Sequence, residues 1–212
     1  MKREPDIAQS RGYGFEKPAK DRIVDASYQL YRIFGIRVGA GPIAHEARSN
    51  IATVTKYFGN CDPLVRQYVS SLIKQCQEWW QDIEARHRHD PEAQLRLWVY
   101  LEQEQAADRF RPQALMSRTA AELPPKDPLL IQIEEYWRAE RLRITNLCDS
   151  AGFERANDLA DKLLLSVQGA RNERAAFGGS PPSRLLSELG DDLMVMHGAS
   201  RKPLLTLDDI ED

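Results

Sequence analysis

The sequence has few cysteines and no long apolar segment, and both absences narrow the classes of protein to which it can belong. Its 212 residues include three cysteines, Cys61, Cys76 and Cys148, which are widely spaced and form no Cys-x-x-Cys pair. We therefore predict neither a disulfide framework nor a zinc cluster, and a reducing cytosol is the expected setting. Residues 1–10 are polar and no run of eighteen apolar residues occurs. Secretion and a membrane span are accordingly not expected.

Motifs of catalysis and of metal binding are also missing. No serine lies in a Gly-x-Ser-x-Gly elbow, and no cysteine has a histidine close in sequence. His87 and His89 have no third ligand nearby, which favours a solvated loop over a metal site. His45-Glu46 lacks the second histidine of a zinc protease helix. We predict no metal, no cofactor and no catalytic residue.

Charge is distributed unevenly along the chain. Hydrophobic residues make up 42% and charged residues 29%, a balance typical of soluble folded proteins. The net charge of -3 argues against a protein devoted wholly to nucleic acid. Residues 1–60, however, contain ten Lys/Arg and six Asp/Glu, whereas the remainder contains nineteen and twenty-six. The basic N-terminal part is therefore the region in which contacts with nucleic acid are expected.

Hydrophobic periodicity predicts an all-α protein of about nine helices. Residues 1–17 show no periodicity, and a first helix is expected from Pro18 to Gly35. Residues 39–42 are expected to form a loop, followed by short helices over 43–48 and 51–58. A long helix should then begin at a cap formed by Asn60 or Asp62.

The remaining helices are expected between residues 90 and 197. The dipeptides Asp90-Pro91 and Asp127-Pro128 predict helix starts, with helices extending to about residues 109 and 150. A short helix is expected over 113–123, and two more over 154–177 and 183–197, separated by the stretch 178–182. The last residues, 198–212, offer little to bury and are expected to form a mobile acidic tail.

Residues 43–58 have the length of a helix, a turn and a second helix. Ala44 and Ala47 allow two helices to approach closely, and Asn50 is suited to capping the second one. Val54 and Phe58 lie four residues apart and share the inner face of that helix. The stretch therefore predicts a helix-turn-helix whose second helix enters the major groove of DNA.

The outer face of this second helix carries groups suited to contacts with DNA. Lys56 and Tyr57 suit phosphate oxygens, whereas the threonines and the exposed methyl groups suit base edges and thymine methyls. No Arg, Asn or Gln in the helix offers bidentate recognition of a base. The residues expected at the DNA interface are Lys20, Arg22, Arg48, Asn50, Ile51, Ala52, Thr53, Thr55, Lys56 and Tyr57.

Several segments match a known family in order and spacing. They are Arg22-Ile23-Val24-Asp25-Ala26, Phe34-Gly35, Ile43-Ala44-His45-Glu46-Ala47, Thr53-Val54-Thr55-Lys56-Tyr57-Phe58 and Gly59-Asn60 with Leu64. With them, residues 20–69 resemble the N-terminal domain of the tetracycline-repressor-like (TetR) family of bacterial transcription regulators. Residues 159–170 and Phe177-Gly178-Gly179 resemble the eighth helix of that family and its exit.

The resemblance implies a cytoplasmic repressor that binds palindromic operator DNA as a homodimer and is released by a small-molecule effector. It implies four regions: a flexible arm (1–17), a helix-turn-helix DNA-binding domain (18–62), a helical ligand-binding and dimerisation domain (63–197) and a flexible acidic tail (198–212). For the effector pocket, aromatic and sulfur side chains of the body are the candidates. They are Trp80, Trp98, Met116, Tyr136 and Trp137.

Two apolar stripes near the C-terminus are the expected subunit interface, because helix pairs from two subunits can form a four-helix bundle. The stripes consist of Leu159, Leu163, Val167, Ala170, Leu186, Leu189, Leu193 and Met196.

The sequence departs from the family pattern at the turn and beside it. Arg48-Ser49 stand where the family usually has Gly and an aliphatic residue, which predicts a distorted turn. Gly41-Pro42 replace polar first-turn residues, and Cys61 replaces a frequent phosphate-contacting lysine. Two alternatives therefore stay open: a helical interaction protein with a degenerate helix-turn-helix, and an enzyme that uses the central pocket.

Overall fold

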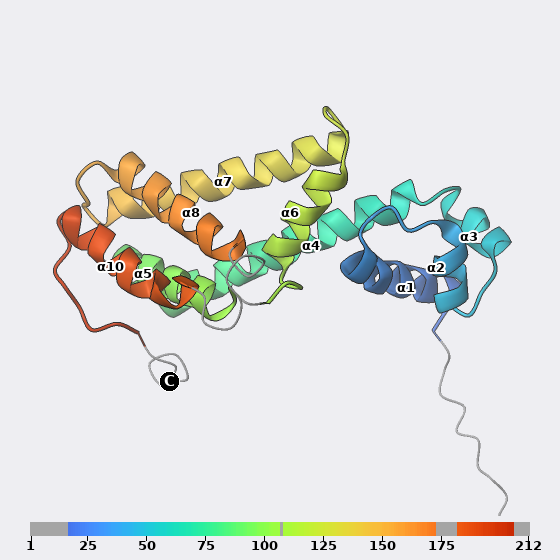
Figure 1. Cartoon of the computed structure of the whole chain (residues 1–212), viewed down its shortest axis with the longest axis horizontal. Coiled ribbons are helices and arrows are strands. Elements are labelled where there is room, and N and C mark those ends of the chain that lie inside the picture. The colour runs from blue at the N-terminus through green and yellow to red at the C-terminus, as the bar shows by residue number, and fades with distance from the viewer. Residues whose placement is uncertain (1–16, 107, 173–181, 206–212) are drawn as a thin grey trace, which may run out of the picture. The chain divides into compact units, whose positions relative to one another are not determined.

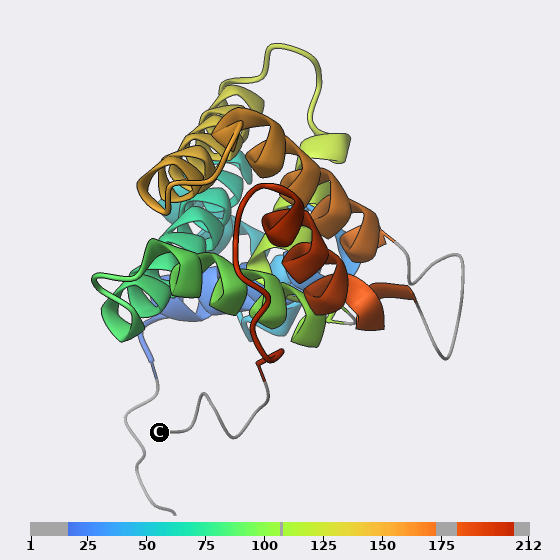
Figure 2. The ribbon, with the colours of Figure 1, turned by 90° about the vertical axis from the view of Figure 1, so that its left-hand side faces the viewer.

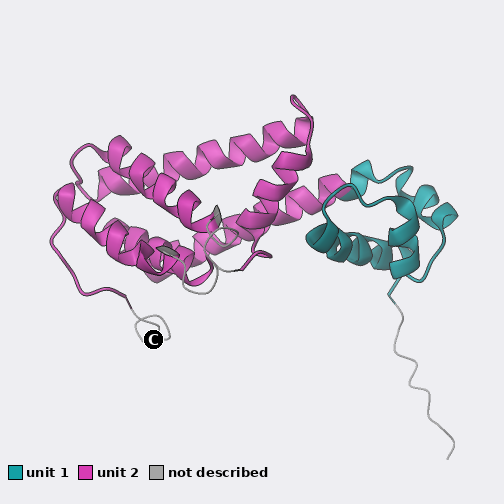
Figure 3. Cartoon of the chain, viewed as in Figure 1, with its two compact units in different colours: residues 1–64 teal, residues 65–212 magenta. Residues whose placement is uncertain are grey.

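The structure, a computed structural model, describes residues 17–106, 108–172 and 182–205 and is helical throughout, with no strand in these ranges. The chain divides into two compact units, Met1–Leu64 and Val65–Asp212 (Figure 3). Figure 1 labels the α-helices, which are α1 (Ala19–Phe34), α2 (Ala40–Glu46), α3 (Ile51–Phe58), α4 (Asp62–Arg86), α5 (Pro91–Glu104), α6 (Pro112–Glu122), α7 (Pro128–Ser150), α8 (Ala156–Asn172) and α10 (Leu186–Met196). A 3-10 helix, η1 (Pro182–Leu185), directly precedes α10.

The first unit is built by α1, α2 and α3 around an apolar centre. Helix α1 contributes Ile23 and Tyr31, α2 contributes Ile43, and α3 contributes Val54 and Phe58, all of them buried. Helix α2 packs against both α1 and α3. The predicted first helix and the two short helices are confirmed. They pack together because each carries one apolar face that the other two cover.

The prediction of a loop over residues 39–42 is wrong. Helix α2 already begins at Ala40, so Gly41 and Pro42 lie in its first turn, and it ends at Glu46. Proline is tolerated there because the amide hydrogens of a first helical turn have no partner within the helix, and proline lacks that hydrogen. The Gly-Pro pair thus starts the helix rather than delaying it.

The turn between α2 and α3 is regular. The Arg48 amide donates to the His45 carbonyl (3.0 Å) and the Ser49 amide to the Ala44 carbonyl (2.8 Å), which is the Schellman pattern of helix termination. Arg48 has a φ of 48°, in the left-handed region where glycine is usual. The expected distortion is therefore absent, and the unusual residue is accommodated by backbone strain at one position.

The second unit is a bundle in which α5 packs against α7, α8 and α10. Its core includes Trp80 and Ile83 of α4, Trp98 of α5 and Ile144 of α7, together with Leu159 of α8. The predicted helix starts at Asp90 and Asp127 are confirmed. Each side chain accepts a hydrogen bond from a first-turn amide, Ala93 for Asp90 and Leu129 for Asp127, both at 2.8 Å.

Three predicted helix bounds differ from the structure. Helix α5 ends at Glu104 rather than near residue 109, because the Asp108 side chain accepts from the Phe110 amide and reverses the chain before α6. Helix α8 begins at Ala156 because the Glu154 amide donates to the His197 carbonyl at the end of α10. The helix expected over 183–197 is split into η1 and α10. The expected end of α8 at 177 and the stretch 178–181 lie outside the described residues.

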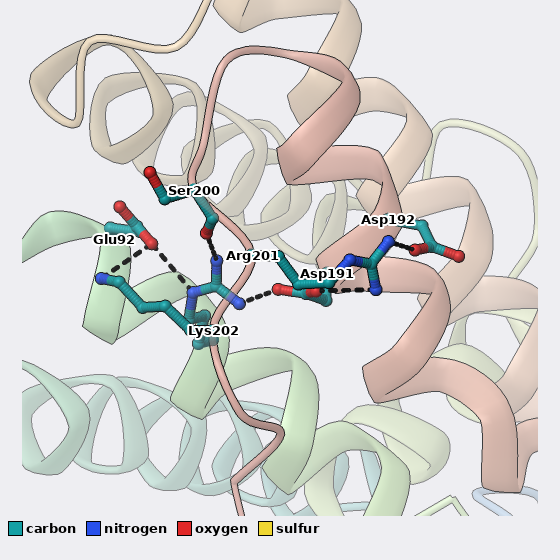
Figure 4. Close-up of polar contacts among 7 residues, drawn as sticks. Glu92, Asp191, Asp192, Ser200, Arg201 and Lys202 are labelled. Carbon is teal, nitrogen blue, oxygen red and sulfur yellow. Dashed lines mark hydrogen bonds and ion pairs between the residues drawn. The ribbon is translucent and has the colours of Figure 1, made fainter.

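The segment after α10 was expected to be a mobile tail from residue 198, whereas the structure shows its first part tied to α5 and α10 (Figure 2). Arg201 pairs with Asp192 (2.5 Å), and Lys202 pairs with Glu92 of α5 (2.9 Å). Arg96 of α5 donates to the Ser200 carbonyl (3.3 Å) and pairs with Asp191 (Figure 4). Residues 200–202 are thus a strap across the two helices.

Among the described helices, none is long and apolar enough to cross a membrane.

Candidate nucleic-acid interface

Helix α3 is fixed at its start by Asn50. The Asn50 side chain accepts from the Thr53 amide (2.8 Å) and from the Thr53 hydroxyl (3.0 Å). This pattern is an N-cap, which satisfies an amide that the helix itself leaves unpaired. Asn50 and Thr53 were predicted to contact DNA, and in the structure they bond to each other and set the helix start.

The remaining predicted residues of α3 share its outer face. Ile51 is 56% exposed and Tyr57 is 44% exposed, and Ala52, Thr55 and Lys56 are exposed as well. Val54 and Phe58, on the opposite face, are buried. The Lys56 ammonium lies 6.0 Å from the centre of the Tyr57 ring. The outer face thus offers one positive charge, two hydroxyl groups and the methyl groups of Ile51 and Ala52.

Arg22 does not behave as the free surface charge that the sequence suggested. Its Nε donates to the Ala47 carbonyl (3.1 Å) and its Nη1 to the Lys17 carbonyl (2.8 Å). It therefore links α1 to the end of α2. No local sequence signal predicts this role, because Ala47 is 25 positions away. Lys20, on the first turn of α1, is exposed.

A groove of about 320 Å³ lies between α1 and the end of α2. Arg48 is exposed at its rim, and Lys17 pairs with Asp25 across 2.6 Å, which raises the pKa of the lysine. Cys61 is half-buried, and burial raises the pKa of its thiol. The thiol therefore stays neutral and supplies no positive charge at the position where the family usually has lysine.

The predicted pocket residues of the second unit are mostly core. Trp80, Trp98, Met116 and Tyr136 are buried, and Trp137 is half-buried. The Trp80 and Trp98 rings stack, with centroids 5.8 Å apart. Burial raises the pKa of the Cys76 thiol, which lies beside Tyr136, to about 12.

The sequence did not reveal a buried ionic network beside these aromatic residues. Glu102 of α5 accepts a hydrogen bond from the Nε of Arg171 of α8 (3.0 Å) and forms an ion pair with Arg111 (Nη1 at 2.9 Å). Glu140 of α7 lies 3.9 Å from Arg171 and is also buried, and burial raises the pKa of its carboxyl group. The four residues belong to different segments of the bundle, so no local spacing indicates the cluster.

Five of the eight residues predicted at the subunit interface are buried within the single chain. Leu159, Leu163, Val167, Ala170 and Leu186 are buried in the core of the single chain, so they are not available to a second subunit. Leu193 is half-buried, whereas Leu189 and Met196 are exposed. The stronger apolar stripe of each helix faces its own bundle, because that is where most apolar area is removed from water.

The exposed apolar residues of α8, η1 and α10 are a different set. Leu165 is 75% exposed and Met196 is 74% exposed, and Leu185 and Leu189 are exposed too. A groove of about 350 Å³ runs between α8 and α10 beside Leu185 and Leu189. We call these four residues the α8–α10 face. Within the described ranges, no group of three or more His, Cys, Asp and Glu side chains could hold a metal ion.

No protein-family model matches the sequence, and no curated protein matches it either. Solved structures do match. A TetR-family transcriptional regulator from Streptomyces coelicolor is 16% identical, with a TM-score of 0.72 over 85% of this chain and 96% of that one. A TetR transcription regulator from Haloarcula marismortui is 18% identical, with a TM-score of 0.67 over 84% and 97%.

A transcriptional regulator from Saccharomonospora viridis, solved in complex with choline, is 15% identical, with a TM-score of 0.68 over 85% of this chain and 96% of that one. All three matches extend over both units. The predicted all-α architecture with its N-terminal helix-turn-helix is thereby confirmed, and the chain has the fold of the TetR-family transcriptional regulators.

Proposed function

We propose that this protein is a transcription regulator that binds operator DNA through α2 and α3. The observation that carries the proposal is the division of α3 into two faces. Val54 and Phe58 anchor it in the first unit, while Thr55, Lys56 and Tyr57 are exposed together on the opposite side. A helix held in this way by its partner helix can enter a major groove without unfolding any part of the unit.

The exposed side chains divide by chemistry. Lys56 and Tyr57 contact phosphate oxygens, which fixes the register of the helix but carries no sequence information. Thr55 contacts a base edge, and the methyl groups of Ile51 and Ala52 contact thymine. Lys20 and Arg48 add positive charge beside the helix. Asn50, Thr53 and Arg22 support the interface by holding the elements that carry it.

The active form in this proposal is a homodimer joined through the α8–α10 face. Four exposed apolar residues on adjacent elements are an interaction surface that a second copy of the chain covers with the same residues. Two-fold symmetry then places two α3 helices in successive major grooves, about 34–36 Å apart, on a roughly palindromic operator.

Regulation in this proposal is release of the operator by a small molecule bound in the second unit. The choline complex of the Saccharomonospora viridis structure supports a ligand site in a body of this fold. The ligand must bind the two dimer conformations with different affinity, because equal affinity shifts no equilibrium. Couplings of this kind typically amount to about 1–3 kcal/mol.

The direct test is a gel-shift titration with DNA that flanks the protein's own gene, at several salt concentrations. Specific binding should weaken steeply with salt, because phosphate contacts release counterions. Lys56→Ala should weaken binding to all sequences alike, by about tenfold, and Thr55→Ala should relax the preference at particular bases by about 1–3 kcal/mol. Lys74→Ala, an exposed lysine of α4 in the second unit, is the matched control. If both α3 variants bind as the control does, α3 is not the reading helix.

A further inference from the structure

The second unit carries a surface groove that shares only Trp80 with the predicted effector pocket. It has a volume of about 390 Å³, in the range of pockets for small molecules, and lies between α4, α5 and α7. Both charged and apolar side chains line it. Those that matter most are Trp80, Glu84, Gln94, Leu142, Arg143 and Leu147.

Arg143 is held in the groove by an aromatic ring. Its guanidinium lies over the Trp80 ring, 5.2 Å from the ring centre, and Trp80 is itself fixed by stacking on Trp98. In the described ranges, Arg143 has no ion pair with a carboxylate. A guanidinium stacked on an indole keeps its N–H edge directed outward, so less side-chain entropy is lost when it binds a carboxylate with two hydrogen bonds.

The groove also carries acceptors for a positive group. Glu84 lies one helical turn beyond Trp80 on α4 and has no ion pair among the described residues. Gln94 is buried, and its side-chain nitrogen donates to the His87 carbonyl (2.7 Å). Its Oε1 has no hydrogen-bond partner in the described part of the chain, which leaves an acceptor in the lining of the groove. This amide oxygen is available to a hydrogen-bond donor of a ligand in the groove.

Leu142 and Leu147 of α7 supply an apolar wall. Leu142 is 59% exposed, although it lies beside a well-packed core. An apolar side chain in the groove would remove this surface from water, which is favourable by roughly 25 cal/mol per Å². The groove thus combines one fixed cation, one carboxylate, one amide acceptor and an apolar wall.

We propose that this groove binds a free α-amino acid with an apolar side chain. The carboxylate of the ligand pairs with Arg143, its ammonium group donates to Glu84 and Gln94, and its side chain packs on Leu142 and Leu147. A simple anion meets the repulsion of Glu84 and a simple cation that of Arg143, so the zwitterion is the best match to both. The assignment specifies the ligand class of the body and rests on the proposed function only for its effect on DNA binding.

The test is isothermal titration calorimetry of the full chain with L-leucine, in the absence of DNA. N-acetyl-L-leucine removes the positive charge and L-leucinamide removes the negative charge, so each should bind at least tenfold more weakly than leucine. Glycine, which lacks the apolar side chain, should bind more weakly as well. Absence of leucine binding in the millimolar range, or equal binding of all four compounds, would overturn the proposal.

Two variants locate the binding site. Arg143→Gln should weaken leucine binding at least tenfold but should not weaken leucinamide binding, because leucinamide has no carboxylate to pair with Arg143 and its cation is no longer repelled there. Glu84→Gln should weaken leucine binding but not N-acetyl-leucine binding. Arg138→Gln, which removes an exposed arginine of α7 that pairs with Glu134, is the control and should bind leucine as the parent does. Equal loss in Arg138→Gln and Arg143→Gln would place the ligand elsewhere.

The two proposals can fail separately. If the protein binds leucine but shows no specific DNA binding, the proposed amino-acid site stands and the proposed role as a transcription regulator is contradicted. Specific DNA binding without leucine binding would support the regulator and contradict the assignment of the groove. If both occur, leucine should change the operator affinity of the parent but not that of Arg143→Gln.

Discussion

The two units bury different kinds of side chain. In the described part of the first unit, Ser27 is the only buried polar residue, and the centre is otherwise apolar. The second unit buries Glu102, Arg111 and Glu140 among its aromatic residues, with Arg171 nearly covered beside them. The first unit is therefore stabilised by apolar packing and carries its charges on its surface, in contact with water. The second carries charges inside, where each depends on a partner.

This difference predicts different sensitivities to the loss of one charge. A buried ion pair contributes little net stability, because desolvation of both ions offsets their attraction, but loss of one partner leaves a buried charge without compensation. Exposed charges keep their hydration and are far less sensitive. All four tryptophans, at positions 79, 80, 98 and 137, lie in the second unit, so tryptophan fluorescence reports its unfolding separately.

The largest effect should come from Glu102→Gln. Arg111 loses its carboxylate partner and Arg171 keeps only Glu140, 3.9 Å away, so the second unit should lose about 3–5 kcal/mol of its free energy of unfolding. Urea denaturation followed by tryptophan fluorescence measures this loss. Glu104→Gln removes an exposed charge from the same helix and should change the free energy by less than about 0.5 kcal/mol. Equal effects of the two variants would show that stability does not depend on the buried network more than on an exposed charge.

The second prediction concerns pH. Burial raises the pKa of Glu140 above the ordinary value of 4.5, so the folded state binds its proton more tightly than the unfolded state does. The resulting stabilisation is fully present below pH 4.5 and is lost as the pH rises through the raised folded-state value. In Glu140→Gln the amide cannot ionise, so this loss should disappear. Urea denaturation of both proteins at a series of pH values measures the difference.

The free-energy gap between parent and Glu140→Gln should shift in favour of the variant as the pH increases. Glu135→Gln, an exposed glutamate of α7, provides the control and should follow the parent across the series. A gap that stays constant with pH would mean that Glu140 titrates alike in the folded and unfolded protein.

The smallest changes in stability are expected from substitutions at two helix ends of the same geometry. Arg48 ends α2 and Gly152 ends α7, and both have positive φ, 48° and 76°. Arg48→Gly should stabilise the first unit by about 0.5–1 kcal/mol, because a residue with a Cβ is strained in the left-handed region. Gly152→Ala should destabilise the second unit by about 1 kcal/mol through backbone strain alone, since a Cβ there meets no atom within 4 Å.

Thermal unfolding followed by circular dichroism, with tryptophan fluorescence for the second unit, measures both changes. The two substitutions should shift stability in opposite directions. A loss of stability in Arg48→Gly would mean that the arginine side chain makes contacts that outweigh its backbone strain.

The three helix starts with a capping side chain were predictable from the sequence because their signals are local. Asn50, Asp90 and Asp127 each cap an amide two or three residues later, and such a bond depends on few atoms beyond the segment itself. Helix bounds that depend on distant residues or on turns were less predictable. The end of α5 at Glu104 depends on the turn at Asp108, and the start of α8 depends on the His197 carbonyl, 43 residues beyond Glu154.

The candidate sites show the same limit. The outer face of α3 was predictable, because Val54 and Phe58 define the inner face and the remaining residues follow from helical periodicity. The role of Arg22 was not predictable, because it bonds to a carbonyl 25 positions away. The groove around Arg143 was not predictable either, because its lining comes from three helices. The same apolar stripe on α8 fits either a core or an interface, and only the packing around Leu159 and Leu163 decided between them.

Local patterns in the sequence predicted the presence of the helices, the caps at Asn50, Asp90 and Asp127, and the two faces of α3, because each rests on contacts between residues a few positions apart. The tertiary structure alone decided which stripe became core, which carbonyls Arg22 holds, and which carboxylates meet Arg111 and Arg171. These depend on residues brought together from distant helices, where burial makes every polar group seek a partner that no local pattern specifies.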